Sequence, residues 1–296
     1  MLLAFTLVAA GSDALQEVLP AALEAVAAAG RPVRETAILG EGAVDMLVEG
    51  EGPPALRGHA QRTLERLPVD FCVQPAEGRR KRLLLADMDS TVIGCECLDE
   101  LAAFAGAGEK VAALTARAMA GEIAFEAALR ERVAMLRGLD LTVLRRVYDE
   151  RVRLTAGAAT LAMTMTAHGA RCVLVSGGFD YFTARVAEAA GFTAYRANRL
   201  IDDGARLTGA VAEPILGRAA KLASLREETA AMGLDPVETM AVGDGANDVE
   251  MIEAAGLGVA WRAQPILAAR ADARVDHADL TALLYFQGYG ADAFAG

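Results

Sequence analysis

Residues 81–91 read KRLLLADMDST, and this stretch decides the fold. The apolar run at residues 83–86 ends abruptly at two carboxylates, Asp87 and Asp89, and a serine and a threonine follow at once. A short, continuous apolar run is typical of a strand that is buried on both faces of a parallel sheet. Ligands of such sheets bind at the carboxyl ends of the strands. We therefore interpret the two acids as site residues behind a buried strand, in preference to a simple helix N-cap.

The chain around this strand predicts an α/β core. After residue 155, strand-like and helix-like patterns alternate, which indicates a parallel, Rossmann-like sheet covered by helices. Residues 97–155 read as helix without a convincing strand, so we expect a small helical cap inserted after the first core strand. We assign the core to residues 77–96 and 156–296, and the cap to residues 97–155.

Residues 1–76 read as a separate unit. Their patterns follow the order strand, helix, strand, strand, helix, strand, with glycines between the second and third strands and prolines opening the second helix. The order βαββαβ is the ferredoxin-like arrangement. We therefore expect a ferredoxin-like domain in front of the core.

Composition excludes several classes of protein. The 296 residues carry a net charge of −11, which argues against sequence-independent nucleic-acid binding and against attraction to anionic lipid. No apolar run approaches the roughly 20 residues that a membrane span needs, and the start lacks the basic region of a signal peptide. We expect a cytoplasmic protein. The four cysteines (Cys72, Cys95, Cys97 and Cys172) form no paired C-x-x-C sets, so a disulfide scaffold or zinc site is disfavoured.

Two further predicted strands are followed by polar and glycine-rich segments. One leads into Ser176-Gly177-Gly178, the other into residues 243–248 (GDGAND), and the helix between them carries Lys221. If the sheet is parallel, these groups meet Asp87 and Asp89 in one crevice. Its carboxylates (Asp87, Asp89, Asp244 and Asp248) call for a hard cation such as Mg²⁺.

The remaining groups of this crevice fit an anion. The serine-glycine turn offers a hydroxyl and backbone N–H groups, and Lys221 adds a positive charge. A metal, an anion cradle and a lysine together predict phosphoryl transfer. One carboxylate beyond those that the metal needs can act as nucleophile, and an acid two residues on can transfer protons.

The motifs resemble those of haloacid-dehalogenase-like phosphatases, and most closely the phosphoserine phosphatase family. D-x-D-S-T corresponds to residues 87–91, and the downstream motifs are VSGGF at 175–179, ANRL at 197–200 and VGDGAND at 242–248. Glu96 and a cap stretch, MAGEIAFEAALRERV, complete the pattern. The resemblance covers roughly residues 82–290.

The resemblance implies a role for each matching residue. Asp87 would be the nucleophile and a metal ligand, Asp89 the general acid/base with its backbone carbonyl on the metal, and Asp244 a further metal ligand. The phosphate would be held by Ser176, Gly177 and Lys221. The amino-acid part would be held by Glu96, on its ammonium, and Arg132, on its carboxylate. Supporting residues would be Asp248, Asn247, Asn198 and Gly178, with Met119 and Phe125 forming an apolar lid.

The resemblance also implies a substrate, O-phospho-L-serine, and a reaction, its hydrolysis in the last step of serine biosynthesis. Two alternatives stay open: a phosphatase or phosphotransferase for another small phosphomonoester such as phosphohomoserine, and an amino-acid-sensing binding protein. The N-terminal domain resembles ACT-like domains. We read it as a structural or dimerising module in preference to an effector site, so a homodimer would form through it.

Overall fold

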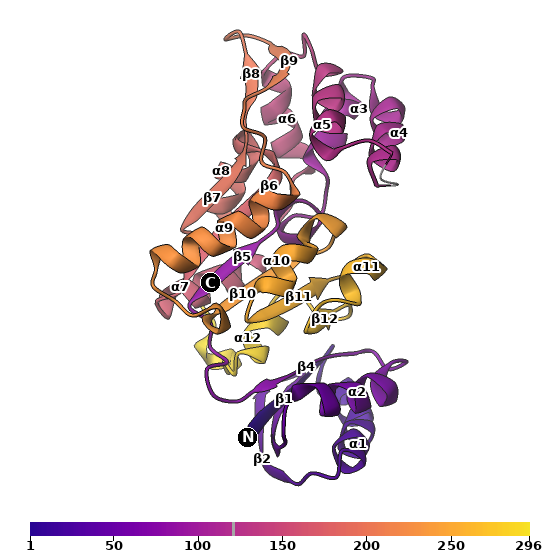
Figure 1. The fold of residues 1–296 in the computed structure, drawn as a ribbon, viewed down its shortest axis with the longest axis vertical. Coiled ribbons are helices and arrows are strands. Elements are labelled where there is room, and N and C mark those ends of the chain that lie inside the picture. The colour runs from indigo at the N-terminus through magenta and orange to yellow at the C-terminus, as the bar shows by residue number, and fades with distance from the viewer. Residues whose placement is uncertain (120–121) are drawn as a thin grey trace.

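The computed structural model describes residues 1–119 and 122–296, without the side chains of Ala118 and Met119. A single ten-stranded sheet runs through it, in the order β2-β3-β1-β4-β12-β11-β10-β5-β6-β7. Figure 1 shows the N-terminal strands at one end, the parallel core in the middle and the cap at the other end. The predicted fold class, a parallel α/β core with a helical cap and a ferredoxin-like N-terminal unit, is confirmed.

The N-terminal unit has the predicted order of elements. They are β1 (Leu2–Ala9), α1 (Ser12–Ala28), β2 (Val33–Gly40), β3 (Ala43–Glu49), α2 (Pro53–Leu64) and β4 (Val69–Pro75). Strand β1 pairs antiparallel with both β3 and β4. Leucine, valine and alanine side chains of α1 and α2 pack with the β1 and β3 side chains in a core of their own. Each fully buried leucine or valine contributes about 1.5–3 kcal/mol relative to exposure.

The core sheet is parallel, as its apolar strands predict. Its strands are β5 (Leu83–Ala86), β6 (Arg171–Phe179), β7 (Ala194–Asn198), β10 (Thr239–Gly243), β11 (Leu257–Trp261) and β12 (Ala273–Val275). Its helices are α7 (Ala158–Ala167), α8 (Asp180–Ala190), α9 (Arg218–Ala231), α10 (Val249–Ala254), α11 (Pro265–Ala268) and α12 (Ala282–Phe286). Strand β5 lies between β10 and β6, and none of Leu83–Ala86 is exposed.

The described residues of the cap form four helices. They are α3 (Cys97–Phe104), α4 (Gly108–Met119), α5 (Phe125–Ala134) and α6 (Thr142–Arg151). An unforeseen hairpin, β8 (Leu200–Asp202) and β9 (Leu207–Val211), lies beside them in Figure 1, and β9 contacts α5. A methyl group on Gly209 would come within 3.2 Å of the Ala134 carbonyl oxygen, so hairpin and helix backbones are close.

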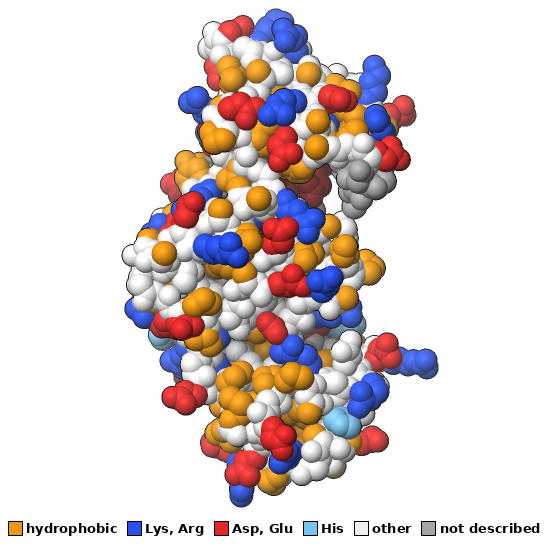
Figure 2. Space-filling view, in the orientation of Figure 1, with side chains coloured by type: hydrophobic (Ala, Val, Ile, Leu, Met, Phe, Trp, Pro, Cys, Tyr) orange, Lys and Arg blue, Asp and Glu red, His pale blue; other side chains and the backbone are white. Residues whose placement is uncertain are grey.

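The N-terminal sheet is joined to the core sheet through β4 and β12, which pair antiparallel at Phe71 and Arg274. The buried Asp70 carboxylate reinforces this junction because it accepts N–H groups from residues 276–278, the shortest at 2.7 Å. On the face in Figure 2, acidic and basic side chains are interspersed, and hydrophobic side chains gather on the N-terminal part. None of the described helices is both long and apolar enough to cross a membrane.

Candidate active site

Asp87 is the first residue after β5 and lies almost completely buried. Its N–H donates to the Val242 carbonyl at 3.0 Å, which extends the β5–β10 ladder to the first acid. Burial, and next the neighbouring Asp248 carboxylate, raises the pKa of Asp87, whereas Lys221 opposes this. Lys221 Nζ lies 2.6 Å from Asp87 Oδ1 and 2.5 Å from Asp248 Oδ1. The lysine therefore bridges two buried acids from different segments, one directly after β5 and one in the 3-10 turn that follows β10.

Both carboxylate oxygens of Asp248 accept hydrogen bonds. Oδ1 accepts from Lys221, and Oδ2 accepts the N–H of Gly245 at 3.1 Å. A methyl group on Gly243 would come within 2.4 Å of the Asp248 carboxyl carbon, so the glycine leaves room for this acid. The resemblance implies that Asp248 supports the site by orienting either metal-bound waters or Lys221, and these contacts are compatible with the second role.

Asp244 follows β10 and lies close to Asp87. The carboxylate oxygens of Asp87, Asp244 and Asp248 lie within 4.8 Å of one another. Thr91 donates its hydroxyl to Asp244 Oδ1 at 3.1 Å. Burial, and then Asp248, raises the pKa of Asp244 to about 6. Three clustered carboxylates, of which Asp87 and Asp244 have raised pKa values, form a donor set suited to a divalent cation.

The Asp89 side chain is not part of this cluster of three carboxylates and contacts Cys97 and Ser176 instead. Oδ1 accepts the N–H of Cys97 at 3.0 Å, and Oδ2 accepts the Ser176 hydroxyl at 3.0 Å. Burial raises its pKa against these hydrogen bonds. A carboxyl group held near the anion cradle, with a tendency to keep its proton, suits a general acid. The predicted metal contact through the backbone carbonyl of Asp89 is compatible with this side-chain arrangement and stays a prediction.

Ser90 has a left-handed backbone, with φ of 58°, in the turn between the two acids and the cap. Its hydroxyl donates to Glu96 Oε1 at 2.6 Å, and its N–H donates to the Cys95 carbonyl at 3.3 Å. Partial removal from water, together with the nearby Asp89 carboxylate, raises the pKa of Glu96 to about 7. Glu96 therefore stands at the cap boundary, directly beside the acid loop.

Arg132 approaches the same region from α5. It donates to the Ala128 carbonyl at 3.3 Å and to Thr115 Oγ1 at 3.2 Å. Burial lowers its pKa, and the Asp99 and Glu96 carboxylates oppose this. Within the described residues Glu96 and Arg132 form no ion pair with each other. The side chain of Met119, predicted as part of the lid, lies outside the described residues.

Phe125, the other predicted lid residue, contacts the anion cradle, which is the turn at Ser176-Gly177-Gly178. A methyl group on Gly177 would come within 3.3 Å of its ring. In the cradle, Ser176 Oγ accepts the N–H of Gly178 at 2.8 Å while its hydroxyl donates to Asp89. Asn247 is half-buried, and its Oδ1 lies close to Gly245. The fold thus brings the predicted cradle and Phe125 together, and the roles of these residues stay predictions.

Three polar residues at this site had no assigned or only a vague role in the sequence reasoning. Thr91 and Ser90 orient Asp244 and Glu96, and their place inside the D-x-D-S-T stretch was the available signal. Asn198 is buried and donates to the Gly177 carbonyl at 2.8 Å. The ANRL motif at residues 197–200 was the available indication of Asn198, but its composition alone predicts only the end of an ordinary strand.

Comparison with known proteins identifies the class to which this geometry belongs. The family model described as haloacid dehalogenase-like hydrolase matches residues 84–253. The chain belongs to the haloacid dehalogenase-like hydrolase family. A haloacid dehalogenase family hydrolase from Salmonella enterica serovar Typhi superimposes with a TM-score of 0.84 at 27% identity, covering 96% of this chain and 98% of that one.

Within that family, its relatives place the chain among the phosphoserine phosphatases. The phosphoserine phosphatase of Archaeoglobus fulgidus is 43% identical over 77% of this chain and 67% of its own length. That of Streptomyces coelicolor is also 43% identical, over 83% of this chain, but the match spans only 60% of the relative. A structure of a phospho-aspartyl intermediate analogue of phosphoserine phosphatase has a TM-score of 0.65 at 37% identity, covering 70% of this chain and 99% of that chain.

Proposed function

We propose that this protein hydrolyses O-phospho-L-serine to L-serine and phosphate with Mg²⁺, through a phosphorylated Asp87. The observation that carries the proposal is the arrangement around Asp87: a buried carboxylate, paired with Lys221, next to two further acids and across from Asp89. The solved phospho-aspartyl analogue belongs to a 37% identical phosphoserine phosphatase, which supports the same chemistry here. The product would make this the serine-forming step of serine biosynthesis.

Asp87, Asp244 and the backbone of Asp89 would hold the cation, which would neutralise the clustered carboxylates and draw charge from the phosphate oxygens. Lys221 and the Ser176-Gly177 cradle would place the phosphorus against Asp87. A carboxylate oxygen of Asp87 then forms a bond to phosphorus as the bond to the serine oxygen breaks. Asp89 gives its proton to that oxygen, which leaves as the serine hydroxyl.

The second half of the reaction reverses the role of Asp89. Now ionised, it takes a proton from water, whose oxygen forms a bond to phosphorus and releases Asp87. Ser176 holds Asp89 in place throughout because it donates to Oδ2, and the Cys97 N–H fixes Oδ1. The position of Asp89 between the cradle and the cap serves both proton transfers.

Selection of an amino-acid substrate would rest on Glu96 and Arg132. The Glu96 carboxylate would accept the ammonium group, and the Arg132 guanidinium would bind the carboxylate. Met119 and Phe125 would close the crevice from the cap and exclude water.

We further propose three domains: an ACT-like domain at residues 1–76, the core at residues 77–96 with 156–296, and the cap at residues 97–155. The ACT-like domain would form a homodimer, and the protein would be cytoplasmic.

A phosphate-release assay tests the proposal. Phosphoserine, phosphothreonine, phosphohomoserine and phosphoglycolate are compared with and without Mg²⁺. We expect Mg²⁺-dependent release with a clear preference for phosphoserine. Equal rates for phosphoglycolate, which lacks an ammonium group, would refute the amino-acid specificity, and no release from any ester would refute the hydrolase function.

A further inference from the structure

Asn198, the last residue of β7, is only 3% exposed behind the anion cradle. Its Nδ2 donates to the carbonyl of Gly177 at 2.8 Å and to that of Leu216 at 3.1 Å. Its Oδ1 accepts the Leu216 N–H at 2.7 Å. Both donor hydrogens of the amide are therefore used, and each is aimed at a backbone group.

The cradle needs such a partner because the sheet is interrupted there. Pairing of β6 with β7 shifts between Val175 and Phe179, the stretch that contains the cradle. The Asn198 side chain donates a hydrogen bond to the Gly177 carbonyl, as the backbone N–H of a neighbouring strand would in a regular sheet. The N–H of the same peptide, that of Gly178, donates to Ser176 Oγ at 2.8 Å. The Gly177–Gly178 peptide is thus fixed at both ends, and rotating it would break two hydrogen bonds.

The second segment that Asn198 holds leads to the lysine helix. Leu216 precedes Gly217, and α9 begins at the next residue and carries Lys221. Phe125 contacts both held segments, since methyl groups on Gly177 and Gly217 would come within 3.3 Å and 3.2 Å of its ring. Asn198 therefore ties together the two backbone segments on which the cap residue rests.

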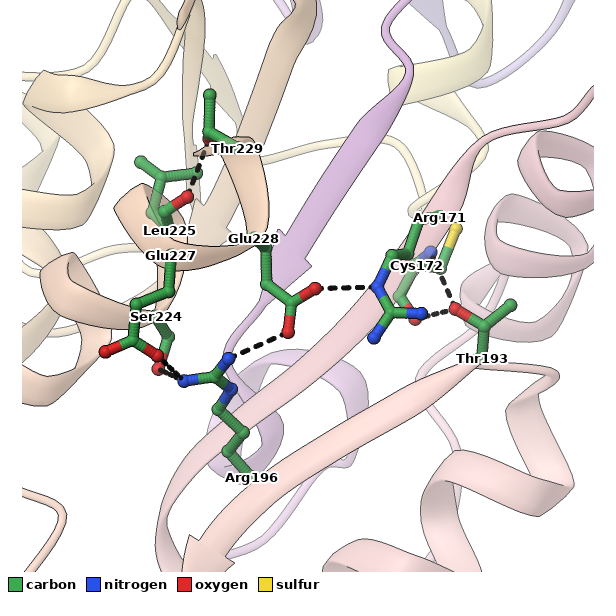
Figure 3. Close-up of polar contacts among 9 residues, drawn as sticks. All are labelled: Arg171, Cys172, Thr193, Arg196, Ser224, Leu225, Glu227, Glu228 and Thr229. Atoms are coloured by element: carbon green, nitrogen blue, oxygen red, sulfur yellow. Dashed lines mark hydrogen bonds and ion pairs between the residues drawn. The ribbon is translucent and has the colours of Figure 1, made fainter. Parts of the chain in front are cut away.

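The body of α9 has a separate anchor. Figure 3 shows Glu228 of α9 between Arg171 of β6 and Arg196 of β7, with contacts of 2.7 Å and 2.8 Å. Arg196 also reaches Ser224 and Glu227. This cluster already fixes the helix to the sheet. We therefore infer that the hydrogen bonds of Asn198 act locally, on the backbone of the cradle.

We propose that Asn198 is a positioning residue for phosphoryl transfer. It holds the Gly177 peptide and the Leu216 backbone in one arrangement. In this arrangement the cradle and Lys221, whose helix follows Leu216, would bind the phosphate together beneath Phe125. The proposal rests on the proposed phosphatase function. Small displacements of a positioned reactive group cost about 100-fold in rate, so the amide should matter for turnover more than for folding.

The test is Asn198→Asp, which keeps the size of the side chain but turns the two donors into an acceptor that faces two carbonyl oxygens. We expect kcat for phosphoserine to fall about 10- to 100-fold near neutral pH, with a similar weakening of competitive inhibition by inorganic phosphate. As pH falls, the introduced carboxyl gains a proton and can donate again. The activity relative to wild type at the same pH should then rise. Asn198→Ala should show the loss without this recovery.

Two controls separate positioning from folding. Gln287 is another buried amide, distant in the fold, that donates to the Leu283 carbonyl at 3.0 Å and accepts the Lys81 N–H at 3.0 Å. Gln287→Glu and Glu228→Gln should lower Tm while kcat of the folded protein stays within about twofold of wild type. Folded Asn198→Asp with wild-type kcat and phosphate inhibition would overturn the proposal, as would equal kcat losses in the controls.

The phosphate readout also distinguishes this proposal from the proposed function. If wild type hydrolyses no phosphomonoester, the hydrolase function fails. The shift of Tm on adding inorganic phosphate then still tests Asn198. A shift that is lost in Asn198→Asp but kept in Gln287→Glu supports the positioning role, and an equal shift in both variants contradicts it.

Discussion

Lys221 Nζ lies 2.6 Å from Oδ1 of Asp87, and both side chains are buried at the carboxyl end of the central strand. The pair joins the residue after β5 to the helix before β10. The two Asp neighbours of the lysine raise its pKa against the effect of burial. The raised pKa favours the charged form of Lys221, which would supply a positive charge beside the proposed attacking oxygen of Asp87.

Replacing this lysine should damage both stability and rate. Lys221→Met leaves Asp87 and Asp248 buried without their cation, which costs about 3–5 kcal/mol in the free energy of unfolding. Loss of the charge beside the phosphate should lower kcat at least about 100-fold. Lys81→Met is the matched control, because Lys81 is also buried but, within the described residues, its Nζ donates to the backbone carbonyls of Gly78 at 3.3 Å and Val237 at 2.8 Å. It should lose stability and keep its kcat, as urea unfolding and phosphate release can measure.

Asp89→Asn should affect leaving groups unequally. The amide keeps the shape of the side chain but has no proton to give, so phosphoserine, with an alkoxide leaving group, should react at least about 100-fold more slowly. With p-nitrophenyl phosphate the leaving group needs little protonation. A pre-steady-state burst should then precede slow turnover, because the second step still lacks its base. A uniform loss for both substrates, without a burst, would contradict the assignment.

Glu96 predicts a pH dependence of substrate binding. Its raised pKa of about 7 means that the carboxylate, which the ammonium needs, forms as pH rises through 7 and is lost below it. The KM for phosphoserine should therefore rise as pH falls from 8 to 6, by more than the KM for phosphoglycolate. Glu96→Gln should remove this difference and raise KM at pH 8. An unchanged pH profile in that variant would show that another group binds the ammonium.

Metal removal should change stability as well as activity. Asp244 has a folded-state pKa of about 6, above its usual value near 4. Without a cation, its contribution to stability is present at low pH and is lost as pH rises through 6. The gain in Tm from Mg²⁺ should therefore grow between pH 5 and pH 7.5, while EDTA abolishes phosphate release. A gain in Tm that is independent of pH would place the metal elsewhere.

Several of these features could be predicted from local sequence, because they depend on short patterns. The buried run at Leu83–Ala86 and the acids after it define a strand and its carboxyl end, and repeated alternation defines the parallel sheet. The family comparisons confirm the class of enzyme. The residue roles follow from the motifs and await the experiments above.

Other features depend on contacts between distant segments and left no local pattern. The pairing of Phe71 with Arg274 makes one sheet of two units, and neither strand's composition encodes its partner. The sequence predicts that Ser176 and Asp89 lie in one crevice, but not that the Ser176 hydroxyl donates directly to Asp89 Oδ2. The β8–β9 hairpin and the left-handed Ser90 also escaped prediction, since the hairpin strands are short and serine gives no signal of positive φ.

The most direct test of the central claim is to locate the phosphoryl group on the enzyme. Phosphoserine carrying labelled phosphate is mixed with the Mg²⁺-loaded protein, quenched in acid within milliseconds and digested, and the labelled peptide is sequenced by mass spectrometry. We predict a hydroxylamine-sensitive acyl phosphate on Asp87, with none in Asp87→Asn, whose turnover should be lower by orders of magnitude. Label on another residue, or wild-type turnover in Asp87→Asn, would contradict the mechanism.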